Sequence, residues 1–323
     1  MSYSQFRKGF EQRSPVATAV QASGAAVTKS TYLLNKDYLT SEWILHVVST
    51  QASTVAATAA SVIDAIQSVT LEFMGSKRGG NGVRINLSGQ ELFDIMRITE
   101  NVPSPITTFT ATLAKVEWSI DIYAALAHAY NDYMTSVYTA EFSQIKLTVN
   151  WNDYTSAGVF SGGTLTGTSV THTSDVSAIN MPVPNTSPNS NSEFYAVAQQ
   201  VAASQRKTPT AAGAGDDVLL QTGQKVRFIL ITSRVSGAFD DAVVDTLKMN
   251  FAGYNHEVTF AALKNENQAD RGFSQTGRAI LDFGDQPDGW LDLRDLNEAR
   301  LKWTALKAGT VDFAQVSMRS LNS

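Results

Sequence analysis

The chain has no cysteine among its 323 residues, and this absence excludes a disulfide framework and any metal site built on thiolates. It also lacks an uninterrupted run of about 18 apolar residues, so no transmembrane helix is predicted. Residues 1–13 do not contain the apolar stretch of a secretory signal. We therefore expect the protein to be synthesised and folded in the cytosol.

Charge is also scarce. Charged residues make up 17% of the chain, the formal net charge is −5 and the pI is about 5.4. A protein that grips nucleic-acid phosphates needs clustered Lys and Arg, so direct sequence-specific binding of nucleic acid is not expected. Hydrophobic residues reach 43%, and the rest of the surface is polar through Ser, Thr, Asn and Gln more than through charge. This composition is typical of a β-rich protein whose faces are covered by neighbours.

Motifs of the common enzyme classes are absent from the sequence. There is no phosphate-binding Gly-x-x-x-x-Gly-Lys-[Ser/Thr] loop, no Gly-x-Ser-x-Gly elbow and no His-Glu-x-x-His pair. The four histidines, His46, His128, His172 and His256, are far apart and share no motif. A histidine on a strand is more often a packing residue than a ligand or a base. The sequence therefore predicts no catalytic residues.

Two stretches, residues 69–75 and 247–253, place apolar side chains at alternate positions and end in glycine. This is the pattern of a β-strand with one buried face, followed by a turn. Each stretch is followed by a second alternating strand, at residues 83–87 and 257–263. The chain therefore contains the same strand pair twice.

The strands around these pairs recur in the same order. Each set has a bulky opening strand, the strand that ends in glycine, its partner, a strand with an inner Asp and a closing alternating strand. A helical turn at 88–95 is expected because Ser88 and Glu91 have the spacing of a capping box. Many short strands separated by turns favour β-sandwiches. The predicted strands are residues 42–48, 69–75, 83–87, 115–123 and 142–151 in the first set, and 225–232, 247–253, 257–263, 278–283, 299–305 and 311–318 in the second.

These patterns divide the chain into four parts: an N-terminal arm at 1–31, a first sandwich at 32–155, a linker region at 156–215 and a second sandwich at 216–323. The linker region combines a long loop rich in Gly, Ser, Thr, Asn and Pro with a helix predicted at 193–205. Apolar spacing within 51–67 predicts either a helix or a long covered loop.

The acidic stretch 282–295 is the best candidate for a ligand site. Carboxylates at Asp282, Asp285, Asp288 and Asp292 have the chemistry that Ca²⁺ prefers. The alternative is a solvated turn in which Asp residues serve the turn geometry.

Two further stretches have both a functional and a structural interpretation. The loop 75–82 carries Lys77 and Arg78, which would suit a loop that binds phosphate. Its place between two strands favours a hairpin loop instead. The five tryptophans suggest a carbohydrate platform, but their positions within alternating strands favour core or interface packing. They are Trp43, Trp118, Trp151, Trp290 and Trp303.

A small basic and aromatic cluster opens the chain. It consists of Phe6, Arg7, Lys8, Phe10 and Arg13. The segment is either a flexible tail or an arm that orders against a neighbouring subunit or a lipid surface, where aromatic side chains insert and basic ones meet anionic headgroups.

The doubled pattern resembles the double jelly-roll major capsid proteins of membrane-containing icosahedral bacteriophages, of the corticovirus and tectivirus type and of the Flavobacterium-infecting lipid-containing phage. The residues that carry the resemblance are the Leu71-x-Phe73-x-Gly75 strand, the block from Val83 to Leu92 and the strands at 299–305 and 311–318. The resemblance covers residues 32–155 and 216–323, and it implies an all-β fold of two tandem jelly rolls with a few short helices.

The resemblance also implies a structural role in a virion. Such a chain forms a homotrimer that acts as a pseudo-hexagonal capsomer and tiles a shell over an internal membrane. Its partners would be neighbouring capsomers, penton or minor capsid proteins and membrane lipid, and the N-terminal cluster would face inward. No cofactor is expected beyond structural calcium.

Two other classes of protein remain alternatives. A tandem β-sandwich adhesin or carbohydrate-binding protein would show exposed aromatic side chains on a concave face. A sandwich-fold hydrolase would use Asp282 or Asp285 with Ca²⁺ and would need carboxylates that converge in a cleft.

Overall fold

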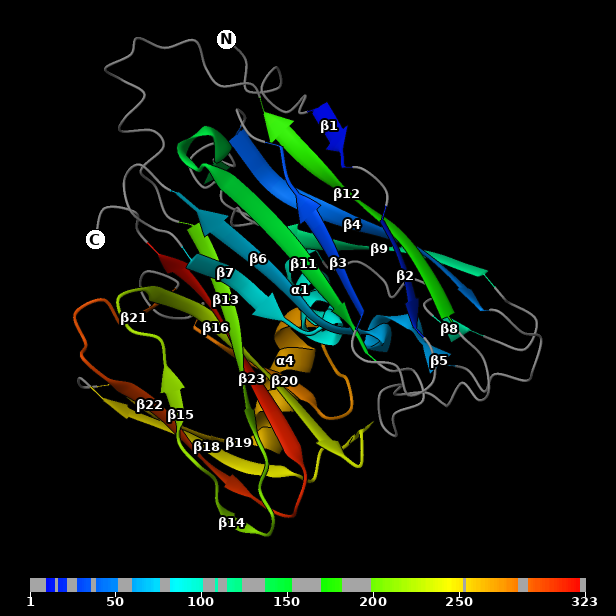
Figure 1. The fold of residues 1–323 in the computed structure, drawn as a ribbon. Coiled ribbons are helices and arrows are strands. Elements are labelled where there is room, and N and C mark those ends of the chain that lie inside the picture. Colours follow the sequence, from blue (N-terminus) through cyan, green and yellow to red (C-terminus); the bar gives the residue numbers. More distant parts are fainter. Residues whose placement is uncertain are drawn as a thin grey trace. The chain divides into compact units, whose positions relative to one another are not determined.

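The computed structural model describes residues 10–14, 17–21, 28–35, 39–51, 60–75, 82–100, 108–109, 115–123, 137–152, 170–181, 199–251, 254–283 and 290–319. The chain divides into two compact units (Figure 1). The first unit comprises Met1–Val201 and Ser320–Ser323, and the second comprises Ala202–Arg319.

The first unit contains two main sheets. In one sheet, β1 (Phe10–Arg13) and β2 (Ala17–Gln21) both pair with β12 (Val170–Met181). On its other side β12 pairs with β4 (Leu39–Gln51). Strand β4 in turn pairs with β9 (Lys115–Tyr123) and β10 (Val137–Tyr138). The other has the order β3 (Thr28–Leu33), β11 (Gln144–Trp151), β6 (Ile66–Met74) and β7 (Gly82–Leu87). Short elements accompany them: β5 (Ala60–Ser61) paired with β8 (Thr108–Phe109), and the 3₁₀ turns η2 (Val62–Ala65) and η3 (Thr139–Glu141).

The second unit also has two main sheets. One has the order β13 (Gln199–Lys207), β23 (Thr310–Arg319), β16 (Lys225–Val235) and β20 (Arg278–Asp282), and the short strands β17 (Ala238–Phe239) and β21 (Leu291–Asp292) also pair with β16. In the other sheet, β14 (Gly213–Ala214) and β15 (Val218–Leu220) both pair with β22 (Ala299–Ala305). Strand β22 also pairs with β18 (Val244–Phe251), and β18 pairs with β19 (Tyr254–Thr259).

The eight main strands of each unit occupy the same places when they are numbered along the chain, with β1 and β2 counted as one strand and β14 and β15 as another. In both units one sheet has the order first, eighth, third, sixth, and the other has the order second, seventh, fourth, fifth. This is the strand order of an eight-stranded jelly roll. The predicted all-β fold of two tandem jelly rolls is therefore confirmed.

The alternating strands build the core of each unit. In β6 the side chains of Val69, Leu71 and Phe73 are buried, and Leu71 lies opposite Leu147 of β11. In the second unit Met249 of β18 lies opposite Leu301 of β22, and both are buried. Burial of each such side chain contributes about 1.5–3 kcal/mol relative to leaving it in water. The predicted strand pair thus lies in the core of both units.

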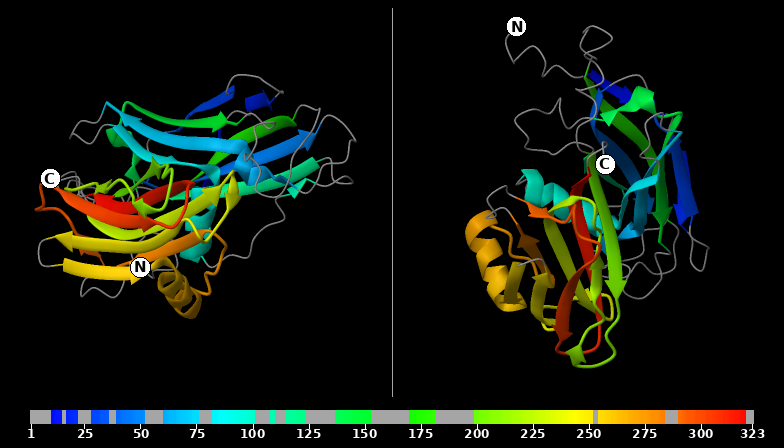
Figure 2. Two further views of the ribbon diagram at one scale, coloured as in Figure 1. Left: turned by 90° about the horizontal axis from the view of Figure 1, so that it is seen from below. Right: turned by 90° about the vertical axis from the view of Figure 1, so that its left-hand side faces the viewer.

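A helix of 12 residues follows the repeated strand pair in both units: α1 (Gly89–Glu100) after β7, and α4 (Phe260–Arg271) after β19. The predicted capping box of α1 is confirmed, because Ser88 N donates to Glu91 Oε2 at 2.7 Å and Glu91 N donates to Ser88 Oγ at 3.3 Å. Figure 2 shows α4, in orange, beside the strands of the second unit.

The second helix was predicted as strand, and the prediction for 257–263 is wrong from Phe260 onward. Thr259 Oγ1 accepts the N–H of Ala262 at 3.2 Å, which starts the helix, and Gly272 ends it in the left-handed conformation at φ 63°. The alternation up to Val258 is that of a strand, but the helix begins two residues later, at Phe260.

The linker prediction for 156–215 is wrong where the structure describes strands. Residues 170–181 form β12, whose buried face carries short polar side chains with partners, such as Asn180, whose Oδ1 accepts from Thr40 Oγ1 at 2.7 Å. The helix predicted at 193–205 is wrong for 199–205, which belong to β13 beside β23. Within 60–67 the structure has β5, η2 and the start of β6, where the sequence predicted either a helix or a long covered loop.

None of the helices among the residues that the structure describes is long and apolar enough to cross a membrane.

Candidate functional site

The N-terminal cluster lies partly on an edge strand of the first unit. Phe10 and Arg13 belong to β1, where they lie opposite Asn180 and Ser177 of β12. The pairing continues at Ser14, whose N–H donates to Val176 O at 2.8 Å. The alternative of a flexible tail is therefore wrong for residues 10–14 and 17–21. Phe6, Arg7 and Lys8 lie outside the described residues, and the contact of the cluster with a membrane or a neighbour stays a prediction.

The acidic candidates are held apart by strand pairing. Asp282 lies at the end of β20, opposite Phe228, and forms an ion pair with Arg271. Asp292 lies on β21, opposite Lys225. Asp285 and Asp288 lie outside the described residues.

Each of the two described candidate ligands, Asp282 and Asp292, forms an ion pair with an arginine. Arg294 Nη2 lies 2.6 Å from Asp292 Oδ2, and its hydrogen bonds hold the pKa of Asp292 below its ordinary value. In the part of the chain that the structure describes, no three His, Asp or Glu side chains gather in a way that would hold a metal ion. The calcium site stays a prediction that depends on Asp285 and Asp288.

A layer of polar side chains lies inside the first unit, where the sequence predicted only packing. Ser49 Oγ of β4 is 2.8 Å from Nδ1 of His172 on β12, and it accepts the indole N–H of Trp118 on β9 at 3.0 Å. Ser49 and His172 are both 0% exposed. Burial lowers the pKa of His172 to about 3, so the imidazole is neutral at physiological pH.

This Ser–His pair has the residue types of a nucleophile and its base, but no substrate reaches it. Catalysis by such a pair requires a reacting atom within hydrogen-bond reach of both groups. The hydroxyl is instead fully buried and already accepts the N–H of Trp118. The pair is therefore structural.

The same polar layer connects the two sheets of the first unit. The ring of His172 stacks on Trp151 of β11 with centroids 4.2 Å apart and planes 3° from parallel. Trp151 Nε1 donates to Ser30 Oγ of β3 at 3.0 Å, and Tyr32 Oη donates to the backbone oxygen of Ser174 at 3.3 Å. Each of these polar groups thus has a partner across or within the sheets, which fixes how the sheets pack. No residue spacing in the sequence marks these partners.

The tryptophans pack in the cores. Trp43, Trp118, Trp151 and Trp303 are buried, and Trp290 is half-buried with the guanidinium of Arg227 5.9 Å from its ring centroid. Among the described residues, the large apolar side chains that are exposed are all aliphatic. The packing interpretation is confirmed for the four buried rings, and the described surface lacks the aromatic platform that a carbohydrate-binding protein needs.

The loop between residues 75 and 82 joins a hairpin, because β6 and β7 pair in antiparallel register. Gly75 has a φ of +66°, and a Cβ atom there would lie 1.9 Å from Ser143 Oγ. Glycine is therefore required both by the backbone and by the close approach of Ser143. Lys77 and Arg78 lie outside the described residues.

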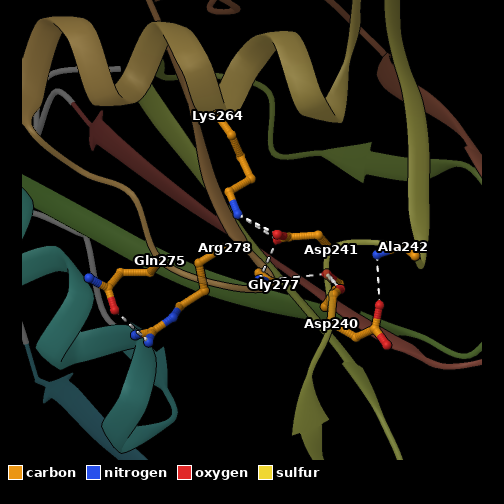
Figure 3. A network of polar contacts seen from close by, with 8 residues as sticks. Asp240, Asp241, Ala242, Lys264, Gln275, Gly277 and Arg278 are labelled. Carbon is orange, nitrogen blue, oxygen red and sulfur yellow. Dashed lines mark hydrogen bonds and ion pairs between the residues drawn. The ribbon is translucent and has the colours of Figure 1, made fainter.

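A polar network that the sequence did not predict connects α4 to neighbouring turns of the second unit (Figure 3). Asp241 Oδ1 accepts from Lys264 Nζ of α4 and from Gly277 N, each at 2.6 Å. The neighbouring Asp240 accepts from Lys307 Nζ at 2.7 Å, which lowers the pKa of its carboxyl group. The network ties three turns to α4 and leaves no group converging on a ligand among these residues.

Comparisons by sequence give no relatives. No protein-family model matches the chain. No curated protein matches it either.

Comparison of the fold gives clear matches among solved structures. The major capsid protein of Sulfolobus turreted icosahedral virus superposes with a TM-score of 0.68 at 17% identity, covering 97% of each chain. The major capsid protein P2 of bacteriophage PM2 has a TM-score of 0.57 at 11% identity, covering 95% of this chain and 98% of that one. The capsid of the virus PBCV-1 gives a TM-score of 0.53 at 11% identity, covering 97% and 94%.

These matches define the fold of the whole chain as a double jelly roll, in agreement with the strand order of the two units. The proteins with which it shares this fold over nearly their full lengths are major capsid proteins of viruses.

Proposed function

We propose that this protein is the major capsid protein of an icosahedral virion. The observation that carries the proposal is the duplication of one jelly roll, strand for strand, within a chain that spans 97% of a viral capsid protein of the same fold. A chain with two copies of one unit presents similar faces at two places, which suits a subunit that tiles a closed surface.

The chain then acts as a homotrimer whose six jelly rolls form a pseudo-hexagonal capsomer. The low charge of the surface supports this role, because broad lateral faces of Ser, Thr, Asn and Gln are buried at less desolvation cost than charged ones. Neighbouring capsomers, penton or minor capsid proteins and the lipid of an internal membrane are its partners. The cluster of Phe6, Arg7, Lys8, Phe10 and Arg13 faces inward, toward membrane or neighbour.

No catalytic role is part of the proposal. The Ser49–His172 pair is sealed in the core, and Ser177, which pairs with His46, is also 0% exposed. Asp282 and Asp292 of the acidic stretch are paired with arginine.

The solution mass of the purified protein tests the proposal. Light scattering is expected to give a stable trimer, three times the 34.9 kDa of one chain. A parallel measurement with EDTA tests the calcium prediction, because dissociation would place an ion bound by the stretch 282–295 at the subunit contact. A monomer at high protein concentration would contradict the capsomer.

A further inference from the structure

Four large apolar side chains are exposed among the residues that the structure describes. They are Leu33, Val83, Leu219 and Leu306, with exposed fractions of 61%, 49%, 54% and 51%. Single exposed apolar residues are normal on protein surfaces. The positions of Leu33 and Leu219 are not independent, however, because both lie on the second strand of a jelly roll, β3 in one unit and β15 in the other.

Strand register shows that two neighbouring positions are equivalent. Leu71 and Met249 occupy the same place in the repeated strand pair, and they lie opposite Leu147 of β11 and Leu301 of β22. The residues that precede these two leucines, Lys146 and Arg300, are therefore equivalent as well.

The exposed leucines sit directly beside these two basic residues. Leu33 lies opposite Lys146, and Leu219 lies opposite Arg300. The two units thus place an exposed leucine and a long basic side chain at the same point on the outer face of the same strands.

The residues on the following strands of the same sheets, beyond Lys146 and Arg300, differ between the units. There the first unit has Glu72 and Val83, where the second has Asn250 and Asn255. Core packing does not explain the repeated leucine, because the side chain points away from the core. The charged partners of the basic residues also differ, with Lys146 Nζ 3.6 Å from Glu72 and Arg300 Nη1 3.3 Å from Asp217.

We infer that Leu33 and Leu219 are two equivalent anchor residues that dock onto further copies of this chain. When both units of one chain occupy similar places in an assembly of copies, each unit contacts a similar surface. The same anchor residue can then serve both contacts. The inference rests on the proposed function.

Each anchor residue makes a small contact between two copies, and this contact recurs at every equivalent position of the assembly. Placing a carboxylate at the centre of an apolar contact removes the burial of the leucine and adds the cost of desolvating a charge. We expect Leu33→Glu and Leu219→Glu each to weaken association between copies about tenfold or more.

The matched control is Leu306→Glu. Leu306 is as exposed as Leu219, is followed by the basic Lys307 and lies between β22 and β23. It has no exposed leucine at the equivalent place of the first unit among the described residues. Leu306→Glu is expected to associate as the unchanged protein does.

The experiment measures sedimentation velocity of the full chain over a range of concentrations, together with electron microscopy of assembled particles. Thermal unfolding of every variant checks the fold, and Leu33→Thr and Leu219→Thr, which keep a strand-forming residue, replace any Glu variant that fails to fold. Reduced association for both anchors, with Leu306→Glu unaffected, supports the inference.

Several results would overturn it. If the unchanged protein forms trimers and both anchor variants assemble normally, the anchors are rejected and the proposed function is left intact. A defect in only one of the two, or an equal defect in Leu306→Glu, would reject their equivalence. An unchanged protein that stays monomeric at all concentrations would reject both the anchors and the proposed function.

Discussion

At the scale of single residues, His172 shows how the sandwich accommodates polar groups. Its ring stacks on Trp151 and its Nδ1 is hydrogen-bonded to Ser49, so the neutral imidazole is satisfied inside an apolar core. A charged imidazole at 0% exposure would lack solvation, which is why burial lowers its pKa to about 3. The residue therefore couples the stability of the first unit to pH.

We predict that this coupling destabilises the protein in acid. The folded-state pKa of about 3 lies below the value of about 6.5 in the unfolded chain, so between these pH values the unfolded state alone binds the proton. The stability is complete above about pH 6.5 and is lost as the pH falls toward 3, by about 2 kcal/mol at pH 5.

Urea unfolding of the protein and of His172→Gln at pH 7 and pH 5 measures this effect. The variant keeps a hydrogen-bonding side chain but no titrating group, so it should lose about 2 kcal/mol less than the unchanged protein between these pH values. His256→Gln, at a half-buried histidine on β19, serves as the control for replacing a histidine elsewhere in the chain. Identical pH dependence in the protein and His172→Gln would refute the assignment.

At the scale of elements, alternation in the sequence predicted the strands that have one strongly apolar face. The predicted range 115–123 matches β9, and 299–305 matches β22. The method failed for β12, because its buried face holds His172, Ser174 and Asn180, whose partners on other strands make burial acceptable. It also failed for β13, where pairing beside β23 overrides the helical spacing of 193–205.

The start of α4 was missed for a related reason. The side chain of Thr259 continues the strand pattern and at the same time caps the helix through the N–H of Ala262. α1 was found because Ser88 and Glu91 satisfy each other three residues apart, whereas α4 has no acidic residue in its first turn. The cap of α4 therefore depends on a single side-chain hydrogen bond.

We predict that Thr259→Ala destabilises the second unit by about 1 kcal/mol, because the N–H of Ala262 loses its acceptor at the start of the helix. Thr259→Ser keeps the hydroxyl group and should remain within about 0.5 kcal/mol of the unchanged protein. Chemical unfolding followed by circular dichroism measures both variants. Equal stability of Thr259→Ala and Thr259→Ser would show that the cap does not contribute.

At the scale of the whole molecule, the doubling of one unit was readable from the sequence, because the strand pairs 69–87 and 247–263 repeat in the same context. The strand order of both units bears this out. The candidate ligand sites were less predictable. Spacing alone grouped Asp282 with Asp292, but pairing of β20 and β21 with different parts of β16 and the nearby Arg271 and Arg294 give both carboxylates other partners.

The capsomer is the central claim, and its arrangement is tested most directly by electron microscopy of the purified protein. The account predicts particles of threefold symmetry with six similar lobes, one for each jelly roll of three chains. The variants Leu33→Glu and Leu219→Glu should reduce the fraction of such particles. Isolated two-lobed particles, one chain each, at every concentration would contradict the account.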